Sequence, residues 1–229
     1  MREAEITKRL LTASELVRSG AVLADIGTDH GYLPIYLILS GKIKRAILSD
    51  INEGPLESAR ANAASSGVSQ YVEFSLADGA RTLENSGATD YTVLGMGGEL
   101  IAKIIDEAPQ LKKSGINLVL QPMTRPEALR KYLFDSGFTV TREVYCIESG
   151  RSYVVINAEF SGKKKPYTDA DTYFGRESIF FGAKSPEMDE YILTAKKRLE
   201  KIIRGKKAGG ECTKREEELL AVLLRRIEK

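Results

Sequence analysis

Acidic side chains follow three consecutive apolar segments of the sequence, at positions suited to binding a nucleoside. Asp25 lies near the end of the first segment, Asp50 ends the second, 23 residues beyond Gly27, and Asp78 follows the third. In an α/β sheet, ligands bind at the carboxyl ends of the strands, where a carboxylate can accept from both hydroxyls of a ribose. Asp78 is suited to accept from an adenine amino group. Alternatively, Asp50 caps the next helix and Asp78 shapes a turn with Gly79.

A loop flanked by glycines joins the first apolar segment to the helix predicted after it. It reads Gly27-Thr28-Asp29-His30-Gly31. Both glycines permit a positive φ and a close backbone approach, and the amides at the helix start favour a carboxylate or a phosphate. A dinucleotide loop has a further glycine where the pyrophosphate approaches, and this loop lacks it. The set therefore favours S-adenosyl-L-methionine, which carries an adenine, a ribose and an amino-acid end but no phosphate.

The later apolar segments end in small or polar residues. The fourth is followed by Gly95-Met96-Gly97-Gly98, and the fifth by Gln121-Pro122-Met123. The glycines are predicted to leave room for a planar base, with Met96 giving soft apolar contact. Arg125 follows near the same crevice and is a candidate to contact the acceptor.

The spacing of apolar residues predicts alternating strands and helices up to residue 160. Strands are expected over 22–26, 45–50, 72–76, 91–94 and 117–120, and helices over 3–18, 32–40, 55–66, 99–108 and 126–136. Two more strands, 139–147 and 152–160, have no helix between them and predict a hairpin. The pattern is typical of an α/β fold with a doubly wound, mostly parallel, seven-stranded sheet and an antiparallel edge.

Strand signals stop after Phe160, which predicts a cofactor-binding domain over 1–160 and a helical domain over 161–229. An apolar stripe from Met188 to Ile203 predicts one long helix. Thr213 and Glu216 have the spacing of a capping box at the start of a second. We expect the two helices to form an antiparallel, coiled-coil-like hairpin.

The charge of the chain is unevenly divided. Residues 1–160 hold 17 Lys and Arg against 20 Asp and Glu, a balance of −3, whereas residues 161–229 hold 17 against 12, a balance of +5. A basic tail suggests a polyanionic partner, with Lys196 and Lys197 as candidate contacts, although solvated helix faces are commonly charged without one. Without a long apolar run we expect a cytoplasmic protein, and Cys146 and Cys212 lack metal-ligand spacing, so no metal is expected.

The sequence resembles class I S-adenosylmethionine-dependent methyltransferases, and within them the bacterial tRNA adenine-22 N1-methyltransferases (TrmK type). The resemblance covers essentially the whole chain and is carried by the stretch from Asp25 to Pro34, by Gly95-Met96-Gly97-Gly98, by Leu120-Gln121-Pro122 and by the helical tail. Asp29 stands where most class I enzymes have glycine, as in that family. No Asn/Asp-Pro-Pro-Tyr/Phe motif follows the fourth strand, which favours a ring nitrogen over an exocyclic amine as acceptor.

The resemblance implies methyl transfer from S-adenosyl-L-methionine to N1 of adenine 22 in tRNA. Neutral N1 carries an in-plane lone pair and needs no strong base, so the site must align the reactants and place negative charge near the purine. Asp29 is the predicted catalytic residue, accepting from the adenine N6 amino group; the alternative is a turn residue or a contact to the cofactor ammonium. His30 contacts the base or only packs in the turn.

The predicted site falls into two groups of residues. Expected cofactor contacts are Asp25, Gly27, Thr28, His30, Gly31, Asp50, Ile51, Asp78, Gly79, Gly95 and Met96. Expected substrate contacts are Gly97, Gly98, Gln121, Pro122, Arg125, Lys196 and Lys197. Three alternatives stay open: another RNA position, a small-molecule or protein acceptor, and a non-catalytic RNA-binding module. A monomer is expected.

Overall fold

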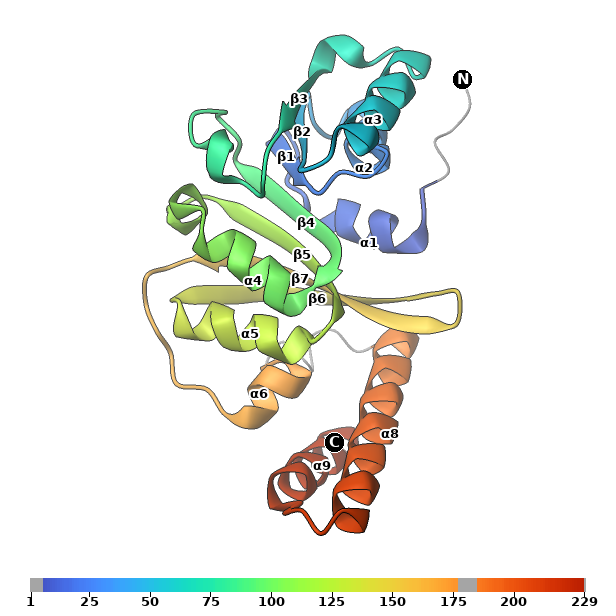
Figure 1. The fold of residues 1–229 in the computed structure, drawn as a ribbon, viewed down its shortest axis with the longest axis vertical. Helices are drawn as coiled ribbons and strands as arrows, with labels where there is room; N and C mark the ends of the chain where they lie inside the picture. Colours follow the sequence, from blue (N-terminus) through green and yellow to red (C-terminus); the bar gives the residue numbers. More distant parts are fainter. Residues whose placement is uncertain (1–5, 177–184, 229) are drawn as a thin grey trace.

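A seven-stranded sheet forms the centre of the molecule (Figure 1). The computed structural model describes residues 6–176 and 185–228. The strands are β1 (Val22–Ile26), β2 (Arg45–Asp50), β3 (Val72–Leu76), β4 (Asp90–Gly97), β5 (Asn117–Thr124), β6 (Phe138–Glu148) and β7 (Arg151–Phe160). Their spatial order is β3-β2-β1-β4-β5-β7-β6, with β1 to β5 parallel and β7 antiparallel to both of its neighbours. The predicted fold class is confirmed.

Helices cover both faces of the sheet. They are α1 (Lys8–Leu16), α2 (Tyr32–Leu39), α3 (Glu53–Ser65), α4 (Gly98–Asp106), α5 (Pro126–Asp135), α6 (Asp169–Phe174), α8 (Pro186–Ala208) and α9 (Lys214–Ile227). Successive strand residues point to opposite faces, so Leu23 packs with α1, α2 and α3, whereas Ala24 packs with α4 and α5. Helices thus bury both faces of the parallel strands. Because β1 to β5 run in the same direction, all of their carboxyl ends lie at one edge of the sheet.

Helices α3 and α4 begin at Glu53 and Gly98, slightly before the expected residues 55 and 99, and two other helix N-termini differ from the predictions as well. The helix expected over 3–18 begins at Lys8, where Thr7 Oγ1 accepts from the Leu10 amide at 3.4 Å, and it ends at Leu16; residues 3–5 lie outside the described part. The capping box expected at Thr213 is wrong. Thr213 is the N-cap, but with ψ near 1° its side chain makes no cap hydrogen bond, and Glu216 instead pairs with Lys206 Nζ at 2.8 Å.

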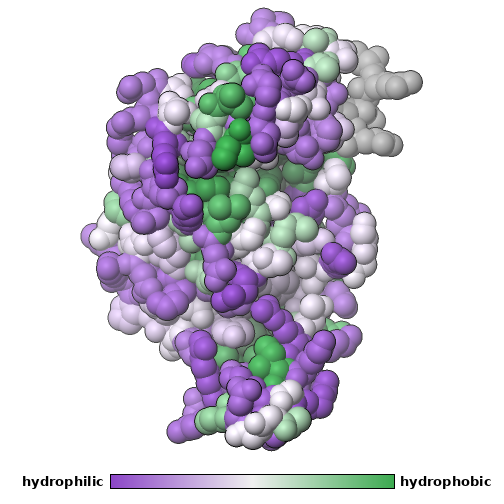
Figure 2. Space-filling view, viewed as in Figure 1, coloured by the Kyte–Doolittle hydropathy of each residue, from purple (hydrophilic) through white to green (hydrophobic). Residues whose placement is uncertain are grey.

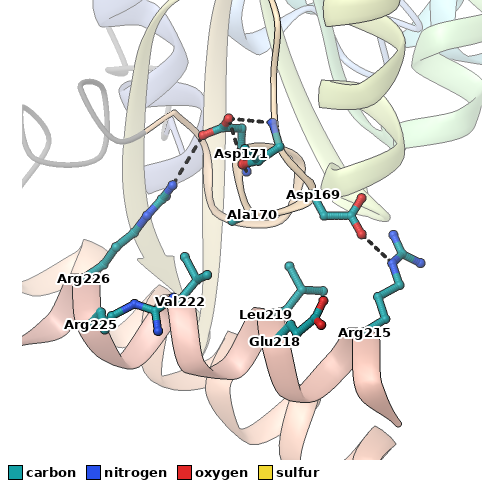
Figure 3. A pocket seen from close by; sticks show the side chains of 10 residues that line it. Asp169, Ala170, Asp171, Arg215, Glu218, Leu219, Val222, Arg225 and Arg226 are labelled. Carbon is teal, nitrogen blue, oxygen red and sulfur yellow. Dashed lines mark hydrogen bonds and ion pairs between the residues drawn. The ribbon is translucent and has the colours of Figure 1, made fainter. Parts of the chain in front are cut away.

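The short helix α6 was not predicted from the sequence. A capping box between Thr168 and Asp171 starts it, and it lies between α5 and α9. A cavity of about 530 Å³ separates α6 from α9, and two ion pairs cross it, Asp169 to Arg215 at 2.6 Å and Asp171 to Arg226 at 3.3 Å (Figure 3). The C-terminal helices are therefore held to the rest of the chain partly by charge.

A buried ion pair anchors the same region from the sheet side. Arg130 of α5 and Glu143 of β6 are fully buried, with Nε to Oε1 at 2.7 Å and Nη2 to Oε2 at 3.0 Å. Arg130 Nη1 also donates to the carbonyls of Thr172 and Tyr173 in α6. A Cβ on Gly175 would lie 2.7 Å from Glu143 Oε2, so the chain leaving α6 packs closely on this pair.

The outer surface is largely hydrophilic on the side seen in Figure 2, with apolar side chains gathered in a band over the upper strands and in a small area at the C-terminal helices. None of the described helices is long and apolar enough to span a membrane. Within residues 6–176 and 185–228, no group of three or more side chains is arranged to hold a metal ion.

Candidate active site

A cleft of about 520 Å³ opens at the carboxyl ends of β1, β2 and β4. Nine of the residues lining it were predicted from the sequence: Asp25, Gly27, Thr28, Asp29, His30, Gly31, Asp50, Gly95 and Met96. The other lining residues are Thr7, Arg9, Leu10, Tyr32, Leu33, Leu94 and Met123. The parallel topology therefore brings residues that lie far apart in the sequence into one hollow, as expected for a ligand site in an α/β sheet.

The loop after β1 has the backbone that its glycines predict. Gly27 and Gly31 have φ of 72° and 69°, a region that other residues rarely adopt. A Cβ on Gly27 would meet Met96 Cε, the end of a flexible side chain that can shift, so the positive φ is the stronger reason for glycine here. A Cβ on Gly31 would lie 2.8 Å from Leu48 Cδ2, so Gly31 serves the close packing of the loop on β2.

Asp25 is buried at the base of the cleft. Its Oδ1 accepts from the Thr92 hydroxyl at 2.6 Å. Burial raises the pKa of Asp25 because it disfavours the charged form; the hydroxyls of Thr92 and Thr28 oppose this rise, and the charge of Asp50 adds to it. Thr28 Oγ1 is itself buried and makes no well-formed hydrogen bond to any described residue. An unsatisfied buried hydroxyl of this kind needs a partner, and a bound ligand can supply one.

Asp50 lies at the end of β2 with its carboxylate on the cleft. Oδ1 accepts from the Asn52 amide at 2.8 Å; Asn52 is itself the N-cap of α3, so this is a turn contact before the helix and Asp50 does not cap it. Oδ2 accepts no hydrogen bond from the described part of the chain. A carboxylate has capacity for several hydrogen bonds, and Asp50 therefore remains able to take ribose hydroxyls.

Three predicted cofactor residues lie beyond the lining of this cleft. Ile51 is 62% exposed, and Asp78 is exposed after β3, one strand further along the sheet edge. A Cβ on Gly79 would lie 3.5 Å from Ile104 of α4, which gives this glycine a contact with the fold. The roles proposed for these three residues stay predictions.

Asp29 is the most exposed acid of the loop. Its side chain is 80% exposed, and Oδ1 lies 3.4 Å from His30 Nε2. The His30 ring stacks on Tyr32 at a centroid distance of 5.2 Å, and the His30 carbonyl accepts from Asn62 Nδ2 at 2.9 Å. No hydrogen bond from its own turn to the Asp29 carboxylate is found among the described residues. Contacts of His30 with Tyr32 and Asn62 therefore hold the loop, and the Asp29 carboxylate remains able to contact a ligand.

The β4 and β5 ends are tied together by Gln121, which binds a residue that sequence reasoning missed, Arg9. Gln121 is buried, and its Oε1 accepts from the Gly95 amide at 3.1 Å and from Arg9 Nη1 at 3.0 Å. Arg9 also donates through Nε to Glu148 Oε1 at 2.7 Å. An arginine in an amphipathic helix looks like any solvated charge, so only the folded chain reveals that Arg9 lines the cleft. Gln121 thus positions the Gly95 turn.

The predicted acceptor residues divide between the cleft and other surfaces. A Cβ on Gly98 would collide with the Arg125 carbonyl, so this glycine admits close packing of α4 on the turn before α5 and leaves no open space on that side. Arg125 has φ of 55°, and its guanidinium pairs with Glu99 and Glu127, each at 3.2 Å. Gly97 lies beside Thr124, and Pro122 lines a neighbouring pocket. Lys196 and Lys197 lie on α8, away from the cleft.

Comparison with known proteins agrees with this geometry. A family model described as a methyltransferase domain matches residues 6–156. The tRNA (adenine(22)-N(1))-methyltransferase of Bacillus subtilis (strain 168) is 35% identical over 167 residues, covering 73% of this chain and 70% of that protein. The structure of Streptococcus pneumoniae Sp1610 in complex with S-adenosyl-L-methionine has a TM-score of 0.82 at 30% identity and covers 96% and 99% of the two chains. The B. subtilis M1A22 tRNA methyltransferase TrmK has a TM-score of 0.76 at 28% identity, covering 99% and 97%.

Proposed function

The chain belongs to the tRNA (adenine(22)-N1)-methyltransferase family, and from this membership we propose that it transfers a methyl group from S-adenosyl-L-methionine to N1 of adenine 22 in tRNA. The observation that supports this function most is the cleft in which Asp25, Thr28 and Asp50 meet. Its polar groups suit the cofactor, since Asp50 Oδ2 and Thr28 Oγ1 make no well-formed hydrogen bond within the described residues and no phosphate has to be bound.

The cofactor supplies a methyl group on a positively charged sulfur. We propose that Asp50 Oδ2 accepts from the ribose hydroxyls and that Thr28 Oγ1 makes a polar contact to the same ligand. Both residues line the cleft, and both atoms have hydrogen-bonding capacity left over. Asp25 and the Gly27–Gly31 loop give the cleft its shape and its negative potential. Asp78 is proposed to reach the adenine from the edge of β3.

In the transfer, the N1 lone pair forms the new bond to carbon while the carbon–sulfur bond breaks and its electron pair stays on sulfur. The adenine becomes cationic, so a carboxylate at the purine lowers the barrier. Asp29 is proposed for this role because its carboxylate is 80% exposed beside the cleft and bound by no backbone amide of its turn. The competing role is a contact to the ammonium of the cofactor.

The helical region 161–229 shares a buried cluster with the strands, and it is proposed to contact tRNA through its basic residues, Lys196 and Lys197 among them. Phosphate contacts of this kind would supply much of the affinity. We also propose that the active species is a monomer, which light scattering of the purified protein measures directly.

Mapping the modified nucleotide tests the proposed function. Unmodified tRNA is incubated with the protein and cofactor, and a reverse transcriptase stop is sought, because a methyl on N1 blocks Watson–Crick pairing. We expect one stop at adenine 22 and none in the same tRNA with guanine at that position. A stop elsewhere would assign another RNA position, and cofactor binding without any RNA methylation would favour a small-molecule or protein acceptor.

A further inference from the structure

A second cavity, of about 290 Å³, lies next to the cofactor cleft. The turn between β5 and α5, the start of β7, and helices α6 and α8 enclose it. Met123 lines both hollows, and Arg9 of the cleft lies over the ring of Tyr153, a residue of the second cavity, at 5.2 Å. Because β7 runs antiparallel to β5, its first residues reach the sheet edge that holds the cofactor cleft. The two hollows are therefore neighbours, with Met123 in the lining of both.

Three tyrosines and several apolar side chains line part of the second cavity, beside a polar group that has no partner in the described part of the chain. Tyr153, Tyr173 and Tyr191 come to it from β7, α6 and α8. Ser152 also lines it, and the Ser152 hydroxyl is buried with no hydrogen-bond partner in the described part of the chain. A buried hydroxyl without a partner costs stability, so its retention beside an open cavity points to a polar ligand atom.

Positive charge borders the same cavity. Arg125 and Arg198 line it, and both guanidinium groups pair with Glu127, at 3.2 Å and 3.4 Å. Arg125 also pairs with Glu99, which lies outside the lining, so the charged residues of the lining itself are two arginines and one glutamate. Tyrosine side chains, one buried hydroxyl and two arginines at one cavity together suit a nucleobase joined to a phosphate backbone.

We infer that this cavity binds one unpaired nucleobase of the tRNA, adjacent in the chain to the adenine that receives the methyl group. The inference rests on the proposed function. The volume of the cavity is at the lower end of ligand pockets, which run from about 300 to 1,000 Å³, so the cavity accepts one base rather than several. Taking the target adenine out of its stack also frees its neighbours, and an unstacked base regains contact on aromatic side chains.

Filling the cavity tests this binding. Ala195 lines it from α8, and Ala195→Leu narrows it with another good helix former. Ala208→Leu is the matched control, because Ala208 is exposed at the far end of the same helix. For Ala195→Leu we expect kcat/KM for tRNA to fall by roughly five- to 150-fold, the effect of losing one stacked base. The dissociation constant for S-adenosyl-L-methionine should stay unchanged, and the control should equal the wild type.

Ser152→Ala separates ligand binding from a structural role without a change of bulk. If the hydroxyl binds the base, the variant keeps its fold and its cofactor affinity, while kcat/KM for tRNA falls by roughly two- to tenfold. If the hydroxyl has no ligand, its removal raises or preserves Tm and leaves tRNA kinetics unchanged, which overturns the inference.

Abasic tRNAs identify the bound base. Each nucleotide next to adenine 22 is replaced in turn by an abasic one. We expect one replacement to weaken the wild type and to have little further effect on Ala195→Leu, because both changes remove the same contact. Additive losses, a loss of cofactor affinity, or identical kinetics in Ala195→Leu and Ala208→Leu would each overturn the inference. A wild-type protein that methylates no tRNA would instead refute the proposed function itself, and the inference with it.

Discussion

At the residue scale, the two carboxylate oxygens of Asp50 differ in their hydrogen bonds. Oδ1 holds the backbone at Asn52, and Oδ2 accepts nothing from the described residues. Asp50→Ala should weaken binding of S-adenosyl-L-methionine by roughly ten- to 100-fold, the effect of losing a charged hydrogen-bond partner. Titration calorimetry measures it, with Glu53→Ala, three residues on in α3, as the control. An unchanged dissociation constant in a folded Asp50→Ala protein would remove Asp50 from the site.

Asp29 should affect chemistry more than binding. Its carboxylate is exposed at the cleft and contacts only His30 among the described residues, so Asp29→Ala should disturb the fold little. If it stabilises the cationic purine, we expect single-turnover methyl transfer at saturating cofactor to slow by roughly 100- to 1,000-fold. Should the rate persist while cofactor affinity collapses, Asp29 is the partner of the cofactor ammonium instead.

At the element scale, the ion pair of Arg130 and Glu143 holds α6 against α5 and β6. Both side chains are fully buried, and Arg130 also satisfies two carbonyls at the end of α6. Arg130→Met should lower the free energy of unfolding by about 3–5 kcal/mol, because it leaves Glu143 charged and unpaired. Chemical denaturation checks this, with Arg130→Met/Glu143→Leu as the comparison. The double variant should recover part of the loss; if it does not, the arginine acts by packing.

The sequence predicts long periodic helices and buried strands well. It predicts poorly those features that depend on contacts between residues far apart in the chain. The expected strands 22–26, 45–50 and 72–76 match β1, β2 and β3. β4 continues to Gly97 because an irregular register keeps Met96 and Gly97 paired with β5, where the glycines predicted a turn. The helix α6 is too short for a periodic signal. Arg9 could not be recognised, since its partners lie 112 and 139 residues away.

At the scale of the whole molecule, the C-terminal helices pack on the sheet as well as carrying charge. Phe174, Met188 and Leu199 belong to the same buried cluster as the strands, so removing 161–229 would expose apolar surface. Charge neutralisation is therefore the sharper test of tRNA contact. Lys197→Gln with Lys201→Gln changes two exposed side chains of α8. The slope of log affinity for tRNA against log salt should flatten by roughly 0.7–0.9 per lost phosphate contact.

Lys44→Gln is the control for this experiment, because Lys44 is exposed just before β2, at the sheet edge opposite the cleft. Cofactor affinity should be the same in all three proteins. Equal salt slopes for the α8 variant and the control would show that these lysines are solvated without contacting RNA.

The long reach of Arg9 has a consequence for the order of events during synthesis. Arg9 leaves the ribosome early, yet Glu148, which fixes its guanidinium, follows 139 residues later. At ordinary elongation rates that gap is on the order of ten seconds, during which β1 and its loop are already outside the exit tunnel. The wall of the cleft formed by Arg9 and Gln121 therefore cannot be completed before the β6–β7 hairpin emerges. Ribosome-bound chains arrested before β6 should hold S-adenosyl-L-methionine poorly, and chains released after β7 should hold it.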